Sequence, residues 1–324
     1  MKANWIVFSL SGLVLLAGAG IGFKSWREQA TKEASMEQLV ADVDSALAAK
    51  PTDSSELSRL WSRLEKTAAL GDDPRVPLSQ ARIELARGHF ESAANLLEPL
   101  VGIGSSNLLA LRAGVLAWQM WYARGGKDAN ERDQLGRRAL LLAESASQLG
   151  GTVEDAFAAW QCAVRLPEDP ATQRFRELLM QQFADTLQAR TVLALSNAQL
   201  DQSLRPMQVL AEEWSTAITA VESSAPAPAV VPMELELAMA ILDLQHQEID
   251  RAKQRLAGLL QQNPSLVEVR NWSATVFHIL ALNNQGAERD RYLRQRDQQL
   301  GWLDSNAQKE DSRRNKWREM RGTR

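Results

Sequence analysis

Helical runs of roughly ten to twenty residues, separated by short turn signals, begin at Glu33 and constrain the fold more than any other feature. The runs are rich in Ala, Leu, Gln, Glu and Arg, whose side chains lose little freedom on a helix. The only candidate strand, VVPM at 230–233, is too short to count. The turn signals are KPTDSS (50–55), GDDPRVP (71–77), GIGSS (102–106), RGGKD (124–128), LGGT (149–152) and LPEDP (166–170). This spacing predicts an all-α chain of paired helices, built as a bundle or a solenoid.

Two stretches share one spacing of small and apolar residues around a turn. The first has a small residue, Gly-x-aromatic at the turn and three apolar positions beyond it: Ala81, Gly88, Phe90, Ala93, Leu97 and Leu100. The second keeps the relative spacing and ends on a helix-stopping proline: Ala240, Gln247, Ile249, Ala252, Leu256, Leu259 and Pro264. Gln247 stands where the first stretch has its turn glycine.

These stretches resemble units of the tetratricopeptide-repeat family. The resemblance covers about half of the chain, and it implies antiparallel helical hairpins stacked as an α-solenoid whose first helices line a concave, protein-binding surface. The hairpins between Leu108 and Asp185 have the rhythm but not the family's period of about 34 residues, so we interpret them as degenerate repeats. The three prolines of 222–232 cannot propagate a helix and indicate a linker.

The predicted organisation has five parts. They are a membrane anchor or signal peptide (1–27), a degenerate helical-repeat array (33–221), a Pro/Ala-rich linker (222–232), C-terminal repeats that resemble the tetratricopeptide type (233–304) and a basic tail (305–324).

The run from Trp5 to Phe23 carries no charge and is long enough to cross a bilayer at a rise of about 1.5 Å per residue. We expect one transmembrane helix; a cleaved signal peptide is the alternative, because Ala17-Gly18-Ala19 has the small-x-small form of a cleavage site. Gly18 and Gly22 form a GxxxG pair that could bring two anchors together, although glycine is common in membrane helices.

The short N-terminal flank before Trp5 is typical of a signal anchor that exports the remaining chain. We therefore expect a single-pass protein of a bacterial inner membrane with its bulk in the periplasm. The excess of Lys and Arg after the run favours the opposite, cytoplasmic orientation, but long domains translocate largely regardless of charge.

The charge distribution is uneven. The net charge of −3 gives no global attraction to nucleic acid, yet residues 309–324 carry seven basic and three acidic residues. This tail is interpreted either as a frayed helix end or as a basic arm that contacts anionic lipid or an acidic partner.

No known catalytic, nucleotide-binding or metal-binding motif occurs in the sequence. Cys162 is the single cysteine, His89 and His246 fall at predicted turns, and His278 lies on an apolar helix. We therefore expect neither an enzyme nor a bound cofactor or metal.

Protein binding is the function that this sequence predicts. Trp118, Trp121 and Tyr122 share one face of a predicted first helix, which either packs inward or anchors a partner. The expected function is a membrane-tethered scaffold for assembly or quality control of a bacterial envelope complex, with a protein partner of unknown identity. The alternative is a permanent structural subunit of a larger membrane-associated machine.

The orientation is testable with two reporters fused to the C-terminal part of the chain. Alkaline phosphatase, which is active only outside the cytoplasm, should be active, and a cytoplasmic reporter at the same position should be silent. The reverse pair of activities would contradict the periplasmic location.

Overall fold

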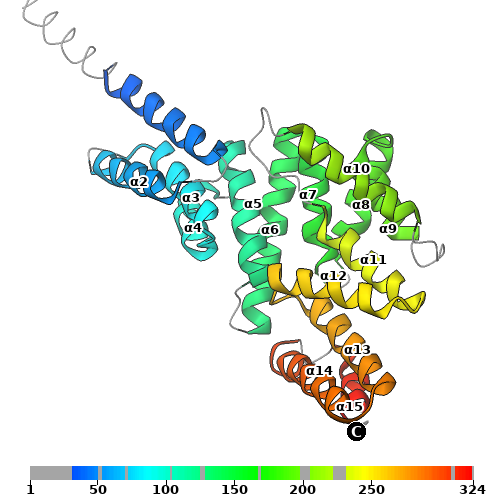
Figure 1. The fold of residues 1–324 in the computed structure, drawn as a ribbon. Helices are drawn as coiled ribbons and strands as arrows, with labels where there is room; N and C mark the ends of the chain where they lie inside the picture. Colours follow the sequence, from blue (N-terminus) through cyan, green and yellow to red (C-terminus); the bar gives the residue numbers. More distant parts are fainter. Residues whose placement is uncertain are drawn as a thin grey trace, which may run out of the picture. The chain divides into compact units, whose positions relative to one another are not determined.

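The computed structural model describes residues 31–49, 53–69, 72–102, 104–124, 128–166, 169–197, 205–221, 231–307 and 311–322. Their regular secondary structure is entirely helical, which confirms the all-α prediction (Figure 1). The chain forms two compact units, an N-terminal unit that ends at Arg87 and a C-terminal unit that begins at Gly88. This division passes through the first repeat-like stretch, whereas the sequence suggested a boundary at 222–232.

In the described residues of the N-terminal unit there are three helices, over residues 31–48, α2 (Ser54–Ala68) and α3 (Arg75–Arg87). The carboxylate of Asp53 begins α2 by accepting a hydrogen bond from the Ser55 amide at 2.8 Å. Each helix buries one apolar stripe in a shared core: Met36, Leu39, Val43, Leu57, Leu60, Leu64, Val76 and Ile83. A short helical unit is therefore stabilised by tertiary packing rather than by helix propensity.

The C-terminal unit contains a longer series of helices. They are α4 (Phe90–Leu97), the short 3₁₀ helix η1 (Glu98–Leu100), α5 (Leu108–Arg124), α6 (Ala129–Gly150), α7 (Val153–Val164), α8 (Ala171–Gln182), α9 (Leu187–Asn197), α10 (Arg205–Val221), α11 (Met233–Gln245), α12 (Ile249–Gln262), α13 (Val267–Asn283), α14 (Gly286–Asn306) and α15 (Arg314–Gly322).

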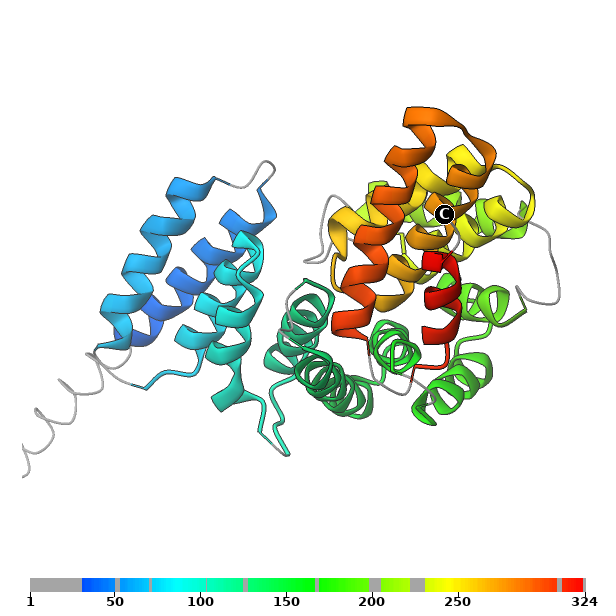
Figure 2. The same ribbon diagram turned by 90° about the horizontal axis from the view of Figure 1, so that it is seen from below.

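From α4 onward, each α-helix of this unit packs against the next α-helix, and alternate helices also touch. Contacts join α5 to α7, α7 to α9, α9 to α11 and α11 to α13. The odd-numbered helices therefore form a continuous row. The even-numbered helices lie between consecutive members of this row in sequence and pack against it (Figures 1 and 2). Because α10 packs against α11, the C-terminal helices are not a separate body.

The turn between α6 and α7 is determined by the LGGT sequence. Thr152 caps α7, and its hydroxyl oxygen lies 2.8 Å from a carboxylate oxygen of the buried Asp155. Arg112 on α5 donates two hydrogen bonds to the same carboxylate, at 2.8 and 2.7 Å. A Cβ atom on Gly150 would lie 2.2 Å from Asp155 Oδ2, so only glycine leaves room for this buried group.

The two repeat-like stretches share a backbone conformation at the turn. Gly88 has a φ of 78° and Gln247 a φ of 64°, both in the left-handed region. Within the described part of the chain, Gln247 is the one non-glycine residue with positive φ. Its conformation is strained, because a Cβ atom disfavours this region.

The basic tail is partly folded. Residues 314–322 form α15, which packs on α13 and α14 through Trp317 and Met320. The Trp317 indole donates to Asn271 Oδ1 at 2.8 Å, and Arg313 pairs with Glu268 and Asp311 at 2.5 and 2.7 Å. Burial acts to raise the pKa of Asp311, but the hydrogen bonds from Arg313 lower it below its ordinary value.

The strained turn generates a reciprocal prediction. Gln247→Gly should stabilise the C-terminal unit by about 0.5 to 1 kcal/mol, because relief of the left-handed strain outweighs the added chain entropy. Gly88→Gln should destabilise by about 1 kcal/mol, because a Cβ at Gly88 meets only the tip of the Phe90 ring at 3.9 Å and the backbone conformation alone is penalised. Denaturant unfolding measures both. If both substitutions raised, or both lowered, the free energy of unfolding, the shared left-handed conformation would be contradicted.

Candidate protein-binding surface

The predicted aromatic face of α5 lies largely within the fold. Trp118 is 5% exposed, and the Arg138 guanidinium of α6 lies 5.7 Å from its ring centroid. The Tyr122 hydroxyl donates to the Arg165 carbonyl at 3.1 Å, and burial raises the pKa of Tyr122. Trp121 is half-buried. Trp118 and Tyr122 thus have the contacts expected of an inward-packing face, and Trp121 is more accessible than Trp118.

A polar cluster lies where α5, α7 and α11 meet. Glu234 at the start of α11 accepts hydrogen bonds from Arg165 and Gln161 of α7, at 2.8 and 3.1 Å. Burial opposes the charge of Arg165, but the charge of Glu234 outweighs it and raises the pKa of Arg165. The cluster links α7 directly to α11, although α9 lies between them in the row of odd-numbered helices. Side chains of this chain therefore fill this part of the row.

Cys162 lies beside this cluster but is not a reactive thiol. Burial raises its pKa to about 11, even though Gln119 Nε2 lies 2.8 Å from Sγ. The thiol is therefore protonated at neutral pH and behaves as a small apolar group.

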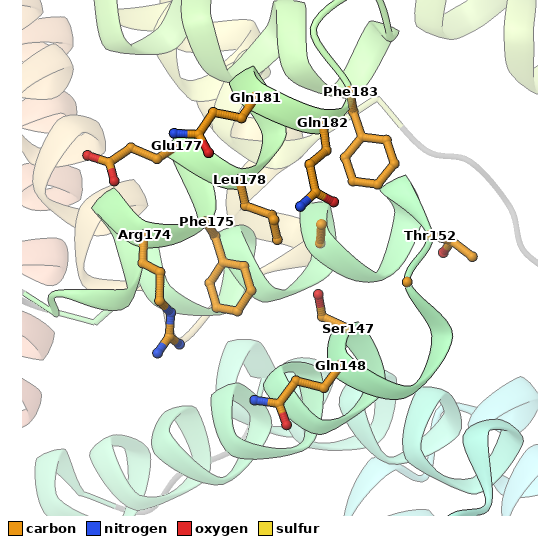
Figure 3. Close-up of a pocket in the computed structure, with 12 residues that line it drawn as sticks. Ser147, Gln148, Thr152, Arg174, Phe175, Glu177, Leu178, Gln181, Gln182 and Phe183 are labelled. Carbon is orange, nitrogen blue, oxygen red and sulfur yellow. The ribbon is translucent and has the colours of Figure 1, made fainter.

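The described residues also form a cleft between α6, α7 and α8, with a volume of about 500 Å³ (Figure 3). Ser147 and Gln148 of α6 stand on one side, and Phe175 and Leu178 of α8 point toward them from the other. Phe183, which follows α8, closes one end. Apolar rings and a leucine thus line a space that is bordered by uncharged amides and hydroxyls.

The rim of the cleft is nearly neutral. Its lining also includes Thr152, Ala156, Gln181 and Gln182. Arg174 at the edge pairs with Glu144 of α6, and Glu177 accepts a hydrogen bond from Gln173 at 2.6 Å. Side-chain amides both donate and accept hydrogen bonds, so the rim can bind the backbone of a peptide while the floor takes an apolar side chain.

No protein-family model and no curated protein matches this chain. The candidate surface therefore rests on the geometry of this chain alone.

The structure also describes the three histidines of the sequence. His89 and His246 lie at helix ends, before α4 and after α11, and both are exposed. His278 lies on α13 with Nδ1 3.4 Å from Arg296 Nη1, and burial, aided by that charge, lowers its pKa. Among the described residues, no three His, Cys, Asp or Glu side chains come together as metal ligands.

The predicted anchor, with Gly18 and Gly22, lies outside the described residues. Within the part that the structure describes, no helix is both long enough and apolar enough to span a bilayer.

Sequence reasoning missed the cleft. The signal for α8 was ordinary amphipathicity, in which Phe175 and Leu179 are buried. Leu178 on α8 and Phe183 just after it are only half-buried, which leaves apolar surface toward α6. An apolar stripe wider than one neighbouring helix can cover was the available hint.

The burial of the α5 face predicts different outcomes at its two tryptophans. Trp118→Ala should lower the free energy of unfolding by ~3 to 5 kcal/mol, because it leaves a cavity in the core. Trp121→Ala should cost less, and if Trp121 anchors a partner it should weaken capture by ~2 kcal/mol, about thirtyfold. Denaturant melts beside a pull-down measure both. A melting loss at Trp121 as large as at Trp118 would remove Trp121 from the binding surface.

Proposed function

We propose that this protein is a non-enzymatic helical-repeat scaffold, similar to the tetratricopeptide type, that binds another protein. The observation that carries the proposal is the contact of alternate helices from α5 to α13, because such stacking is how solenoids build extended binding surfaces. The proposed setting is the bacterial inner membrane, with the bulk of the chain in the periplasm and roles in assembly or quality control of an envelope complex. That setting rests on the sequence of residues 5–23.

The cleft between α6, α7 and α8 is the surface that supports binding best. In the tetratricopeptide family the first helices of the hairpins bind partners, but here Tyr122, Arg165 and Glu234 fill part of that side. The cleft lies on the side of the even-numbered helices and has an uncovered apolar floor. We propose that it takes an apolar side chain from an uncharged peptide segment, with Trp121 as an additional contact.

The C-terminal helix extends the proposal to charged partners. Lys316 and Arg318 on α15 are exposed, while Arg313 and Arg321 already pair with carboxylates of this chain. Contact with anionic lipid or an acidic partner would therefore use the first two residues.

A permanent subunit of a larger machine is the second candidate. Leu109 and Leu116, seven residues apart on one face of α5, are 64% and 47% exposed. An apolar stripe of this kind is typical of surfaces that stay covered in an assembly. Size analysis after detergent extraction separates the two candidates: a free monomer or dimer supports the scaffold, and a large complex of constant size supports the subunit.

A matched pair of tryptophan substitutions tests the cleft. Gln148 and Gln134 are both exposed on α6, but only Gln148 lines the cleft. Gln148→Trp should fill the cleft and reduce recovery of copurifying partners from the tagged full-length protein at least about thirtyfold, at an unchanged melting temperature. Gln134→Trp should retain the partners that mass spectrometry identifies with the parent protein. Equal recovery with both variants would refute the cleft as the binding site.

A further inference from the structure

Helices that are far apart in the series of the C-terminal unit meet. Arg132 at the start of α6 donates hydrogen bonds to the carbonyl and the side chain of Asn306, the last residue of α14 and 174 positions away. Arg124 at the end of α5 donates to the Gln262 carbonyl at the end of α12, at 3.0 Å. Figures 1 and 2 both show α14 returning to the side of α6.

Trp302 is the centre of this closure. The Arg132 guanidinium lies 5.0 Å from its ring centroid, and the Arg270 guanidinium of α13 lies 4.7 Å from it. Arg270 is held in place by donating to Pro264 and Gln299, each at 2.7 Å. Two guanidinium groups from different helices therefore share one indole.

The closure differs in kind from the rest of the packing. Consecutive helices pack along their lengths, whereas α6 and α14, and α5 and α12, do not. The described contacts across the closure are long side chains, the hydrogen bond from the Ser265 amide to the Ala123 carbonyl at 2.9 Å, and the apolar contacts of Ala123 and Tyr122 with the core of α11 to α14. None of these contacts joins two consecutive helices.

Arg132 also carries its charge in a buried position, which is unfavourable for a charged group. It is 4% exposed, and burial lowers its pKa below the ordinary value. The hydrogen bonds to Asn306 and the contact with the Trp302 ring compensate part of this desolvation.

We infer that Arg132, Trp302, Arg270 and Asn306 form a latch that holds the C-terminal unit closed and opens as a unit while the helix pairs stay folded. Opening separates the start of α6 from the end of α14. The latch is independent of any partner.

A distance measurement between the start of α6 and the end of α14 tests the latch. Cys162→Ala removes the single cysteine, and Asn130→Cys with Ser305→Cys places spin labels at exposed positions of α6 and α14. The parent pair should give one narrow distance distribution. Adding Arg132→Ala and Trp302→Ala should shift it to longer distances and broaden it. Arg137→Ala, which removes an exposed pair with Asp133 on α6, should leave it unchanged.

Hydrogen exchange in the unlabelled full-length protein gives a second readout that needs no variant. The Ser265 amide should exchange at least about tenfold faster than the amide of the buried Leu300, because it is released by opening rather than by unfolding. The milder Trp302→Leu should accelerate Ser265 further and leave Leu300 unchanged.

Two results would overturn the latch. One is an unchanged distance distribution in the folded double variant. The other is exchange of Ser265 and Leu300 at the same rate in the parent protein, since closure and global folding would then be a single event.

Discussion

Contact between alternate helices is the constraint on which the C-terminal unit depends. Every odd-numbered helix from α5 to α13 carries at least one fully buried alanine: Ala117, Ala159, Ala189, Ala240 and Ala274. A methyl group at such a position lets two helix backbones approach closely, and the larger residues around it then fill the remaining space. The row positions everything else, including the α6–α8 cleft and the meeting of α6 with α14.

The two kinds of contact differ in strength as well as in form. Burying a leucine between helices stabilises by roughly 1.5 to 3 kcal/mol, and each consecutive helix pair buries several apolar side chains. A guanidinium over an indole contributes about 0.5 to 2 kcal/mol, depending on how far it is desolvated. The closure through Trp302 is therefore worth a few kcal/mol at most, far less than the row that it spans. An open form at low population is the physical consequence.

The sequence predicted the helices and several of their ends, because both depend on local chemistry. Gly150 and Thr152 end one helix and cap the next, and Gly88 adopts the left-handed turn that its position indicated. Periodicity reports that a face is buried but not which helix covers it. The Arg132–Asn306 contact and the division after Arg87 therefore could not be predicted from the periodicity. The role of Trp317 could not be predicted for a different reason. One buried indole anchors α15, whose other residues are mostly charged or polar.

The closure and the cleft together limit which surfaces a partner can use. A ligand that binds between the start of α6 and the end of α14 requires the open form, and its apparent affinity falls in proportion to the fraction of open molecules. The cleft between α6 and α8 carries no such penalty, because Ser147, Gln148 and Leu178 line it in the closed form. A partner at the cleft alone leaves the closure equilibrium unchanged if it binds both forms equally. A partner that also bound between α6 and α14 would hold the latch open, so a two-site ligand would couple binding to the separation of α6 from α14.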